Sequence, residues 1–347
     1  MRKLFPICFT VLVSLGAEEN QTYERAMPPT YVSHPSSPHP KNEWIIKPFG
    51  FASFLYWDCS QGGSEIAVNA NSAGLSSSGI LLGGSSQSMS FGMNLGFRAG
   101  AGFLLPWERT SLGGAYTYLD VKNSKNFLPG SGQAIFPLLA NPSVLPVSAT
   151  QAKSRWNMSF QNLDVDFEKR YNVSKAVTVL PDLGLKAAWI SQHRSVDYLG
   201  LSGVFTGVVS PSTYESSDHN DFSGLGLKLG GTSLWYFGWG FGMFGLLKGA
   251  LLAGNFHVKQ NDTFGGQTVN SFTSKLWRMV PTVQCGIGLD WGHAFGDCAI
   301  KFSCAYEAQY WWGQNQFARF TTAQPGYVRS IDDLAFQGLT ASAGISF

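Results

Sequence analysis

The segment MSFGMNLGFRAGAGFLL, residues 89–105, constrains the fold more than any other part of the chain. Apolar residues, most of them large, occupy every second position, and most positions between them hold glycine, serine, asparagine or arginine. A period of two residues is typical of a β-strand and not of a helix. The segment is also much longer than the about five or six residues usual for strands of soluble sheets. Something apolar must therefore cover one face of this strand over its whole length.

The same alternation recurs along most of the chain after residue 44. It is clearest in the segments from Trp277 to Trp291 and from Cys298 to Tyr310, where apolar and aromatic residues alternate with polar or small ones. In WNMSFQNLDVDF the apolar positions change parity between Phe160 and Leu163, which predicts a β-bulge. We expect ten strands, near residues 45–58, 88–104, 110–121, 154–169, 175–191, 221–233, 239–259, 274–292, 297–312 and 332–347.

The connections between these strands are of two kinds. Short segments, LPWER, RYNVSK, WYFGW and HAFG, follow every second strand, and the other connections are long. This layout is typical of an all-β fold, a transmembrane antiparallel up-and-down β-barrel with short periplasmic turns and long extracellular loops. All 11 tryptophans fall near predicted strand ends, where we expect two aromatic girdles. Lipid would then cover the large residues, and the small and polar ones would face a lumen.

The two ends of the chain indicate export to the outer membrane. Residues 1–17 have the layout of a secretory signal peptide, with Arg2 and Lys3 before a short apolar run and cleavage expected after Ala17. Residues 18–43 are polar and rich in proline, which predicts a flexible periplasmic tail. We assign residues 44–347 to the barrel. The final LTASAGISF is similar to the C-terminal strand signal of outer-membrane proteins, so we expect the outer membrane of a Gram-negative-type bacterium.

Charged residues on the predicted inner faces suggest what the lumen could do. Their two signs balance, which predicts weak charge selectivity, and inward glycines would widen a barrel that is narrow at ten strands. Both features favour passive diffusion of small hydrophilic solutes and ions. The alternative is that the charges pair across the lumen and stiffen the barrel. The predicted inward charges are Arg98, Arg155, Lys186, Lys228, Arg278 and Lys301 against Asp164, Asp166, Glu168, Asp182, Asp290 and Glu307.

The cysteines of the exported chain pose a question of pairing. Cys8 leaves with the signal peptide, and four others remain in an oxidising setting. If the turn HAFG is centred between Ala294 and Phe295, Cys285 lies directly opposite Cys304 on the lipid-facing side of two paired strands. Such a pair could form a disulfide, and two free thiols acting as small hydrophobic residues are the alternative.

Several other functions leave little trace in this sequence. The glycines of GLGLKLGG follow the strand period, so they do not indicate a nucleotide loop, and no basic cluster indicates nucleic acid. We expect no cofactor and no metal. A protease could use Asp218 and His219, but no second aspartate motif accompanies them, so we expect no enzyme. The segment from Leu234 to Gly254 is long enough for a membrane helix, although its many glycines and Lys248 argue against one.

The longest internal loop supports a different function. Residues 123–153 contain an apolar stretch from Ile135 to Val147, and full exposure of such a stretch to water would be unfavourable. The loop therefore either folds inward as a constriction or docks on a partner. The second possibility indicates a structural or adhesive barrel.

Three stretches together resemble one known family. They are FASFLYWDCSQGGSEIAV from Phe51, GFRAGAGFLLPWERTSLGGAYTYL from Gly96, and LDVDFEKRYNVSKAVTVLPDLGLKAAWISQHRSVDY from Leu163. They resemble the Legionella-type major outer membrane protein family, which includes MOMP-like proteins of chlamydia-related bacteria. The resemblance implies an abundant barrel that acts as a porin and is sometimes linked to envelope rigidity and host contact. The expected partners are membrane lipid, small hydrophilic solutes, host or envelope molecules and a second copy of the chain, and no catalytic residue is implied.

Overall fold

A computed structural model describes residues 46–71, 84–106, 109–141, 148–202, 213–320 and 327–347. The predicted signal peptide at 1–17 and the predicted tail at 18–43 lie outside these residues, as do Trp44 and Trp107. In the described part of the chain, no helix is long and apolar enough to span a membrane.

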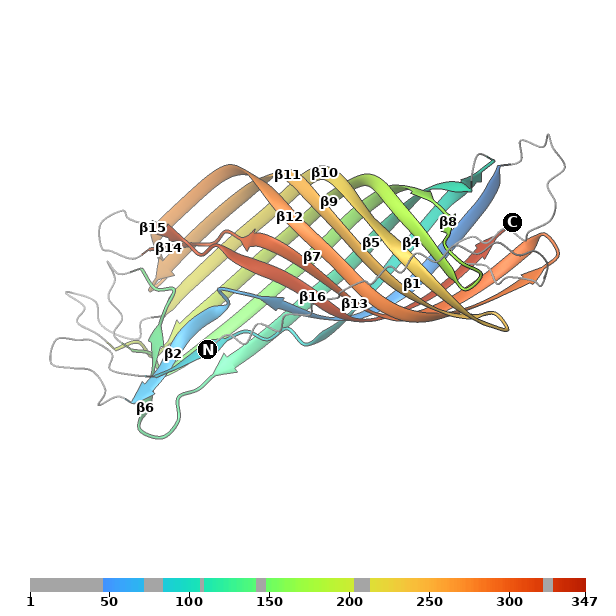
Figure 1. Ribbon diagram of the computed structural model, residues 1–347. Helices are drawn as coiled ribbons and strands as arrows, with labels where there is room; N and C mark the ends of the chain where they lie inside the picture. Colours follow the sequence, from blue (N-terminus) through green and yellow to red (C-terminus); the bar gives the residue numbers. More distant parts are fainter. Residues whose placement is uncertain (1–45, 72–83, 107–108, 142–147, 203–212, 321–326) are drawn as a thin grey trace.

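Ten long strands form a closed antiparallel ring (Figure 1). Strand β10 pairs with β9 on one side and with β11 on the other, so the ring has no free edge. This closure confirms the predicted all-β, ten-stranded transmembrane barrel. In ring order the strands are β10 (Tyr214–Gly238), β11 (Phe241–Phe264), β12 (Gln267–Phe295), β13 (Cys298–Asn315), β16 (Asp332–Ser346), β1 (Lys47–Gln61), β4 (Met93–Leu105), β5 (Thr110–Phe127), β7 (Gln151–Lys169) and β9 (Val177–Leu199).

The short connections all lie at one end of the barrel, where Figure 1 also shows the C-terminus. The turn between β10 and β11 is tight and places Trp239 at φ 55° and Gly240 at φ 86°. The segment from Leu234 to Gly254 therefore folds as this hairpin, and the alternative of a membrane helix is wrong. The turn between β7 and β9 carries the two-residue strand β8 (Tyr171–Asn172).

Large apolar side chains cover the outside of the barrel. On β4, Leu95 and Phe97 are exposed while Arg98 points inward, as the alternation predicts. We use the name lipid belt for the outward apolar band on strands β7 and β9 to β12, whose last row before the outer end consists of Leu163, Ala187, Leu225, Ala253 and Met279. Because hydrocarbon chains are the expected neighbours of these side chains, their exposure is favourable.

Beyond the lipid belt, strands β9 to β12 continue farther than the sequence predicts. The expected ends were residues 191, 221, 259 and 274, and the observed ends are Leu199, Tyr214, Phe264 and Gln267. The outward side chains of these extensions are mostly polar, so the lipid-type alternation is lost although the strands continue. A small sheet of β2 (Glu65–Asn71), β3 (Ser85–Ser88) and β6 (Gln133–Pro137) and a hairpin of β14 (Ala318–Phe320) and β15 (Tyr327–Arg329) belong to this outer end (Figure 1).

Strand β7 contains no bulge, contrary to the prediction. Its pairings with β5 and β9 run without a register shift through residues 160–163. Phe160 points into the barrel and is fully buried, whereas Leu163 points outward and is 38% exposed. The apolar residues change face because the barrel interior is apolar near the outer end and polar farther down, and not because the backbone is irregular.

The outer tryptophan girdle is only partly as predicted. Trp189, Trp277 and Trp312 point outward and are exposed at the end of the strands where we expected them. Trp57, Trp156 and Trp311 instead point inward and are at most 1% exposed. At the end with the short turns, Trp239 is exposed. Half of the six predicted outer girdle residues are therefore core residues.

The predicted pairing of Cys285 with Cys304 is wrong. The β12–β13 hairpin extends to the pair Phe295 and Cys298, so its turn consists of Gly296, at φ 61°, and Asp297. This shift places Cys285 opposite Ala308 and Cys304 opposite Leu289. Cys59, Cys285, Cys298 and Cys304 are all free thiols in the described structure.

This register predicts which engineered disulfide can form. Directly opposed residues lie about 4.5 to 5.5 Å apart at Cα, which a disulfide can span. Leu289→Cys should therefore form a bridge to Cys304, whereas the matched control Ile287→Cys, which lies opposite Tyr306, should not. Mass spectrometry of unreduced, alkylated protein would detect the bridge. A disulfide between Cys285 and Cys304 in the unmodified protein would contradict the register.

Candidate functional site in the barrel interior

The half of the interior nearer the short turns contains a cluster of buried charges. Asp164, Asp166 and Glu168 follow one another at every second position of β7, so all three point inward. We use the name carboxylate–lysine cluster for the set of Asp164, Asp166, Glu168, Asp182, Lys186, Lys228 and Lys248. Strand β9 supplies Asp182 and Lys186, and strands β10 and β11 supply the other two lysines.

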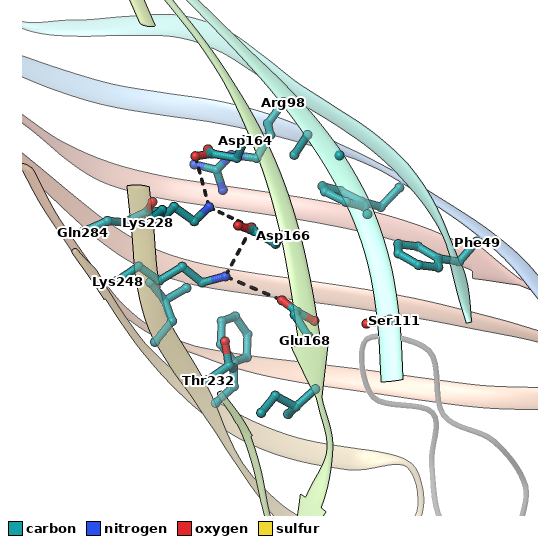
Figure 2. A pocket seen from close by; sticks show the side chains of 17 residues that line it. Phe49, Arg98, Ser111, Asp164, Asp166, Glu168, Lys228, Thr232, Lys248 and Gln284 are labelled. Atoms are coloured by element: carbon teal, nitrogen blue, oxygen red, sulfur yellow. Dashed lines mark hydrogen bonds and ion pairs between the residues drawn. The ribbon is translucent and has the colours of Figure 1, made fainter. Parts of the chain in front are cut away.

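Two lysines join the carboxylates of this cluster across the interior. Figure 2 shows Lys228 and Lys248 reaching toward the three carboxylates of β7. The Nζ atom of Lys228 lies 3.0 Å from Asp164 Oδ1 and 2.7 Å from Asp166 Oδ2. The Nζ atom of Lys248 lies 3.0 Å from Asp182 Oδ2 and 3.6 Å from Glu168 Oε1. Strands β10 and β11 are not neighbours of β7, so these ion pairs join strands of the wall that do not hydrogen-bond to each other.

Two further ion pairs continue the polar layer around the wall. The guanidinium of Arg98 donates two hydrogen bonds to the carboxylate of Glu307, at 3.1 and 2.9 Å, and Gln284 donates a third at 3.1 Å. Lys301 lies 2.9 Å from Asp290. Paired, hydrogen-bonded charges can be buried at much lower cost than isolated ones. The layer is therefore a set of ion pairs and not a row of free charges along a channel.

An aromatic layer spans the interior above the charges. The ring of Phe160 on β7 lies 5.4 Å from the ring of Trp311 on β13 and 4.6 Å from that of Phe336 on β16, measured between centroids. Strands β7 and β13 are five steps apart in either direction around the ring of ten strands, so they face each other across the barrel. The side chains of Phe160, Trp311 and Phe336 therefore come into contact in the middle of the barrel interior.

Loop residues pack on top of this aromatic layer. Phe91 and Phe317 pack against Trp156, with ring centroids 5.1 and 5.6 Å away. Ile135 and Leu139 are 1% and 6% exposed and belong to the same apolar core. The described part of the apolar stretch 135–147 thus folds inward, one of the two outcomes expected for it, and residues 142–147 lie outside the described structure.

A fully buried ion pair lies within this outer core, beyond the lipid belt. The Arg194 guanidinium donates two hydrogen bonds to Asp218 Oδ2, at 3.0 and 2.6 Å, and both side chains are 1% exposed. Burial raises the pKa of the Asp218 carboxyl, and the guanidinium beside it opposes that rise. Arg194 also lies 4.4 Å from the ring centre of Phe317, so it holds that loop residue in the core.

Aromatic side chains occupy the space beside two inward glycines of β4. A Cβ atom at Gly100 would lie 2.5 Å from the ring of Phe51, and one at Gly102 would lie 2.5 Å from the ring of Phe49. These glycines therefore make room for aromatic rings of β1. A cavity of about 100 Å³ is lined by both rings together with Arg98, Asp166 and Lys228.

The structure places most of the predicted interior residues where the sequence put them. Arg155 is the exception, because it faces outward with its side chain 64% exposed, 3.2 Å from Asp197. Its assignment was wrong because it depended on the bulge that β7 lacks. Arg278 points inward but forms no ion pair with another residue of the described structure. The residues found in the polar layer are Arg98, Asp164, Asp166, Glu168, Asp182, Lys186, Lys228, Asp290, Lys301 and Glu307.

Sequence reasoning missed Lys248, which carries three contacts of the cluster. Its surroundings, FGLLKGALL, are apolar on both faces of the strand, so no alternation marks its direction. The register with β12 could have revealed it, because Lys248 lies opposite the inward residue Gln284.

Asp218 and His219 do not form a catalytic pair. Asp218 is buried in its ion pair with Arg194, and His219 faces outward against His193, with ring centroids 4.1 Å apart. Neighbouring residues of a strand point to opposite faces, so the two side chains cannot act together. The expectation that the chain is not an enzyme stays a prediction.

Comparison with known proteins assigns the barrel to a family. The family model described as "Legionella pneumophila major outer membrane protein precursor" matches residues 36–347. The chain belongs to this family. The match covers the whole described barrel, confirms the resemblance drawn from the sequence and places the protein in the outer membrane. No curated protein matches the chain.

Solved outer-membrane structures are similar to this family member only at low identity. The protease OmpT from Escherichia coli is 11% identical, with 87% of this chain and 96% of that chain covered and a TM-score of 0.39. The translocator domain of NalP from Neisseria meningitidis is 8% identical, with coverages of 89% and 90% and a TM-score of 0.33. A FadL homologue from Pseudomonas aeruginosa is 8% identical, with coverages of 87% and 90% and a TM-score of 0.28.

Breaking an ion pair of the carboxylate–lysine cluster should lower the free energy of unfolding much more than breaking an exposed ion pair. Lys248→Met would leave Asp182 and Glu168 without this partner, and breaking a buried pair costs about 3 kcal/mol. The matched control Arg155→Gln breaks an exposed pair and should change the free energy of unfolding by less than about 1 kcal/mol. Denaturant titration of the refolded barrels, followed by tryptophan fluorescence, would measure both. Equal losses would contradict the assigned role of the cluster.

Proposed function

We propose that the protein is a closed outer-membrane barrel that holds a platform of extended strands and loops at the cell surface, where it contacts envelope or host partners. The observation that carries this proposal is the meeting of Phe160 with Trp311 and Phe336 across the barrel. Side chains of the rigid wall form this closure. Removing a loop would leave it in place.

The two filled layers further support a structural role. Buried ion pairs in one layer and packed aromatic rings in the other tie together strands that are not neighbours. The strands β9 to β12 continue beyond the lipid belt with polar outer faces, which suits a surface exposed to water. A stiff barrel of this kind is an effective base for recognition loops.

Conductance measurement tests the closed state directly. Wild-type protein in planar bilayers should show no steady conductance above the empty membrane, and liposomes containing it should swell in small sugars no faster than empty ones. Deletion of residues 135–147 should give the same result, because the rings of Phe160 and Trp311 remain in contact. Rapid swelling with the wild-type protein would overturn the proposal.

A second candidate function is the porin that the family resemblance implies. The cavity beneath the aromatic layer favours it, because charged residues of both signs line this cavity, which suits small hydrophilic solutes without strong charge selectivity. Solutes could cross only after the aromatic layer moved aside. In this proposal Phe160, Trp311 and Phe336 act as the barrier between the cavity and the cell exterior.

Removing the aromatic contact tests whether it blocks the path through the barrel, as both proposals require. Phe160→Ala combined with Trp311→Ala should open a path through the aromatic layer and raise single-channel conductance well above wild type. The control Val165→Ala changes an outward residue of the same strand β7 and should leave conductance unchanged. If the wild type already conducts as well as the double variant, the aromatic layer is not a barrier.

A further inference from the structure

The outer edge of the lipid belt carries an ordered polar surface across strands β7 and β9 to β12. The strand pairings align its residues in two transverse rows, which we name the polar band. The row next to the lipid belt contains Gln161, Trp189, Ser223, Asn255 and Trp277. The row above it contains Ser159, Ser191, Asp221, His257 and Lys275.

The side chains of the polar band surround a groove. Nine of its ten members line an open groove of about 500 Å³ on the outer surface of the barrel, the exception being Trp277. Three serines, Ser159, Ser191 and Ser223, lie among larger side chains and leave space above the sheet. The groove therefore has room for a group much larger than a water molecule.

The position of the groove identifies its neighbours in the membrane. The outward row directly below the band is apolar and consists of Leu163, Ala187, Leu225, Ala253 and Met279. Successive outward rows are about 7 Å apart, because strands rise about 3.3 Å per residue. A lipid whose hydrocarbon chains cover the apolar row must place its headgroup against the polar band.

The side chains of the band suit a sugar that carries phosphate. Asp221 is held by a hydrogen bond from the Ser191 hydroxyl at 2.5 Å, and it can accept further bonds from sugar hydroxyls together with the amides of Gln161 and Asn255. The Lys275 ammonium at one end of the groove can bind a phosphate. Trp189, 46% exposed, offers an indole face at the same level.

We propose that the polar band binds the phosphorylated sugar headgroup of an outer-leaflet glycolipid. A simple phospholipid has a phosphate for Lys275 but offers few hydroxyl groups to the amides, the serines and Asp221. The band therefore discriminates in favour of the glycolipid. This inference concerns the outer surface and does not depend on whether the lumen conducts.

The experiment measures binding to the folded, full-length protein in detergent by native mass spectrometry. The probe is a purified bisphosphorylated glucosamine glycolipid, and its dephosphorylated form and phosphatidylglycerol are comparison ligands. Two variants alter the band. The double variant Lys275→Gln with His257→Gln removes the basic end, and Ser223→Trp fills the groove. Both change outward residues, and heat-modifiable migration on gels shows that each variant is folded.

Both variants should weaken binding of the phosphorylated glycolipid by about tenfold or more. The dephosphorylated form should bind the wild type more weakly and lose nothing further in the double variant. The control Lys153→Gln removes an outward charge of β7 six residues, or about 20 Å, beyond Ser159 and should bind like the wild type. Wild-type affinity in both band variants, an equal loss in the control, or equally tight binding of phosphatidylglycerol would overturn the proposal.

Discussion

The rest of this structure depends on the rule that no backbone polar group can remain unpaired in a lipid bilayer. A sheet satisfies this rule only by closing on itself, and the pairing of β10 with both β9 and β11 completes that closure. A barrel closed with ten strands has a narrow interior. The lipid around it requires apolar side chains on its outer face. The alternation of the strands then follows, because each residue must face either lipid or the interior.

A narrow interior must be filled, and this barrel is filled in two different ways. Where lipid surrounds the wall, the interior holds charges that neutralise one another, as Lys228 does between Asp164 and Asp166. Beyond the lipid belt, the outer face meets water and the interior becomes an apolar core around Phe160. Along the barrel axis the outer face therefore changes from apolar to polar, while the interior changes from mainly charged to mainly apolar around the buried Arg194–Asp218 pair.

This reversal explains how far the sequence could predict the structure. Inside the lipid belt most strands alternate strongly, so the strand number, the topology and the direction of residues such as Arg98 follow from the pattern. At the reversal the pattern changes parity, and a bulge at Phe160 was the wrong explanation because the surroundings change while the backbone stays regular. The register of β12 with β13 could not be predicted, because it depends on which two residues form the turn, and Gly296 and Asp297 were not distinguished from their neighbours. Lys248 was missed where both faces of the strand are apolar.

The carboxylate–lysine cluster also has a consequence for how the barrel assembles. Its members come from β7, β9, β10 and β11, so each lysine finds its carboxylates only when these strands are aligned correctly. A slip of one residue in β10 would turn Lys228 toward hydrocarbon and leave Asp166 without this partner inside. The buried charges thus favour the correct alignment of the strands during insertion. A misaligned sheet would expose a charge to hydrocarbon on its outer face and leave a carboxylate unpaired on its inner face.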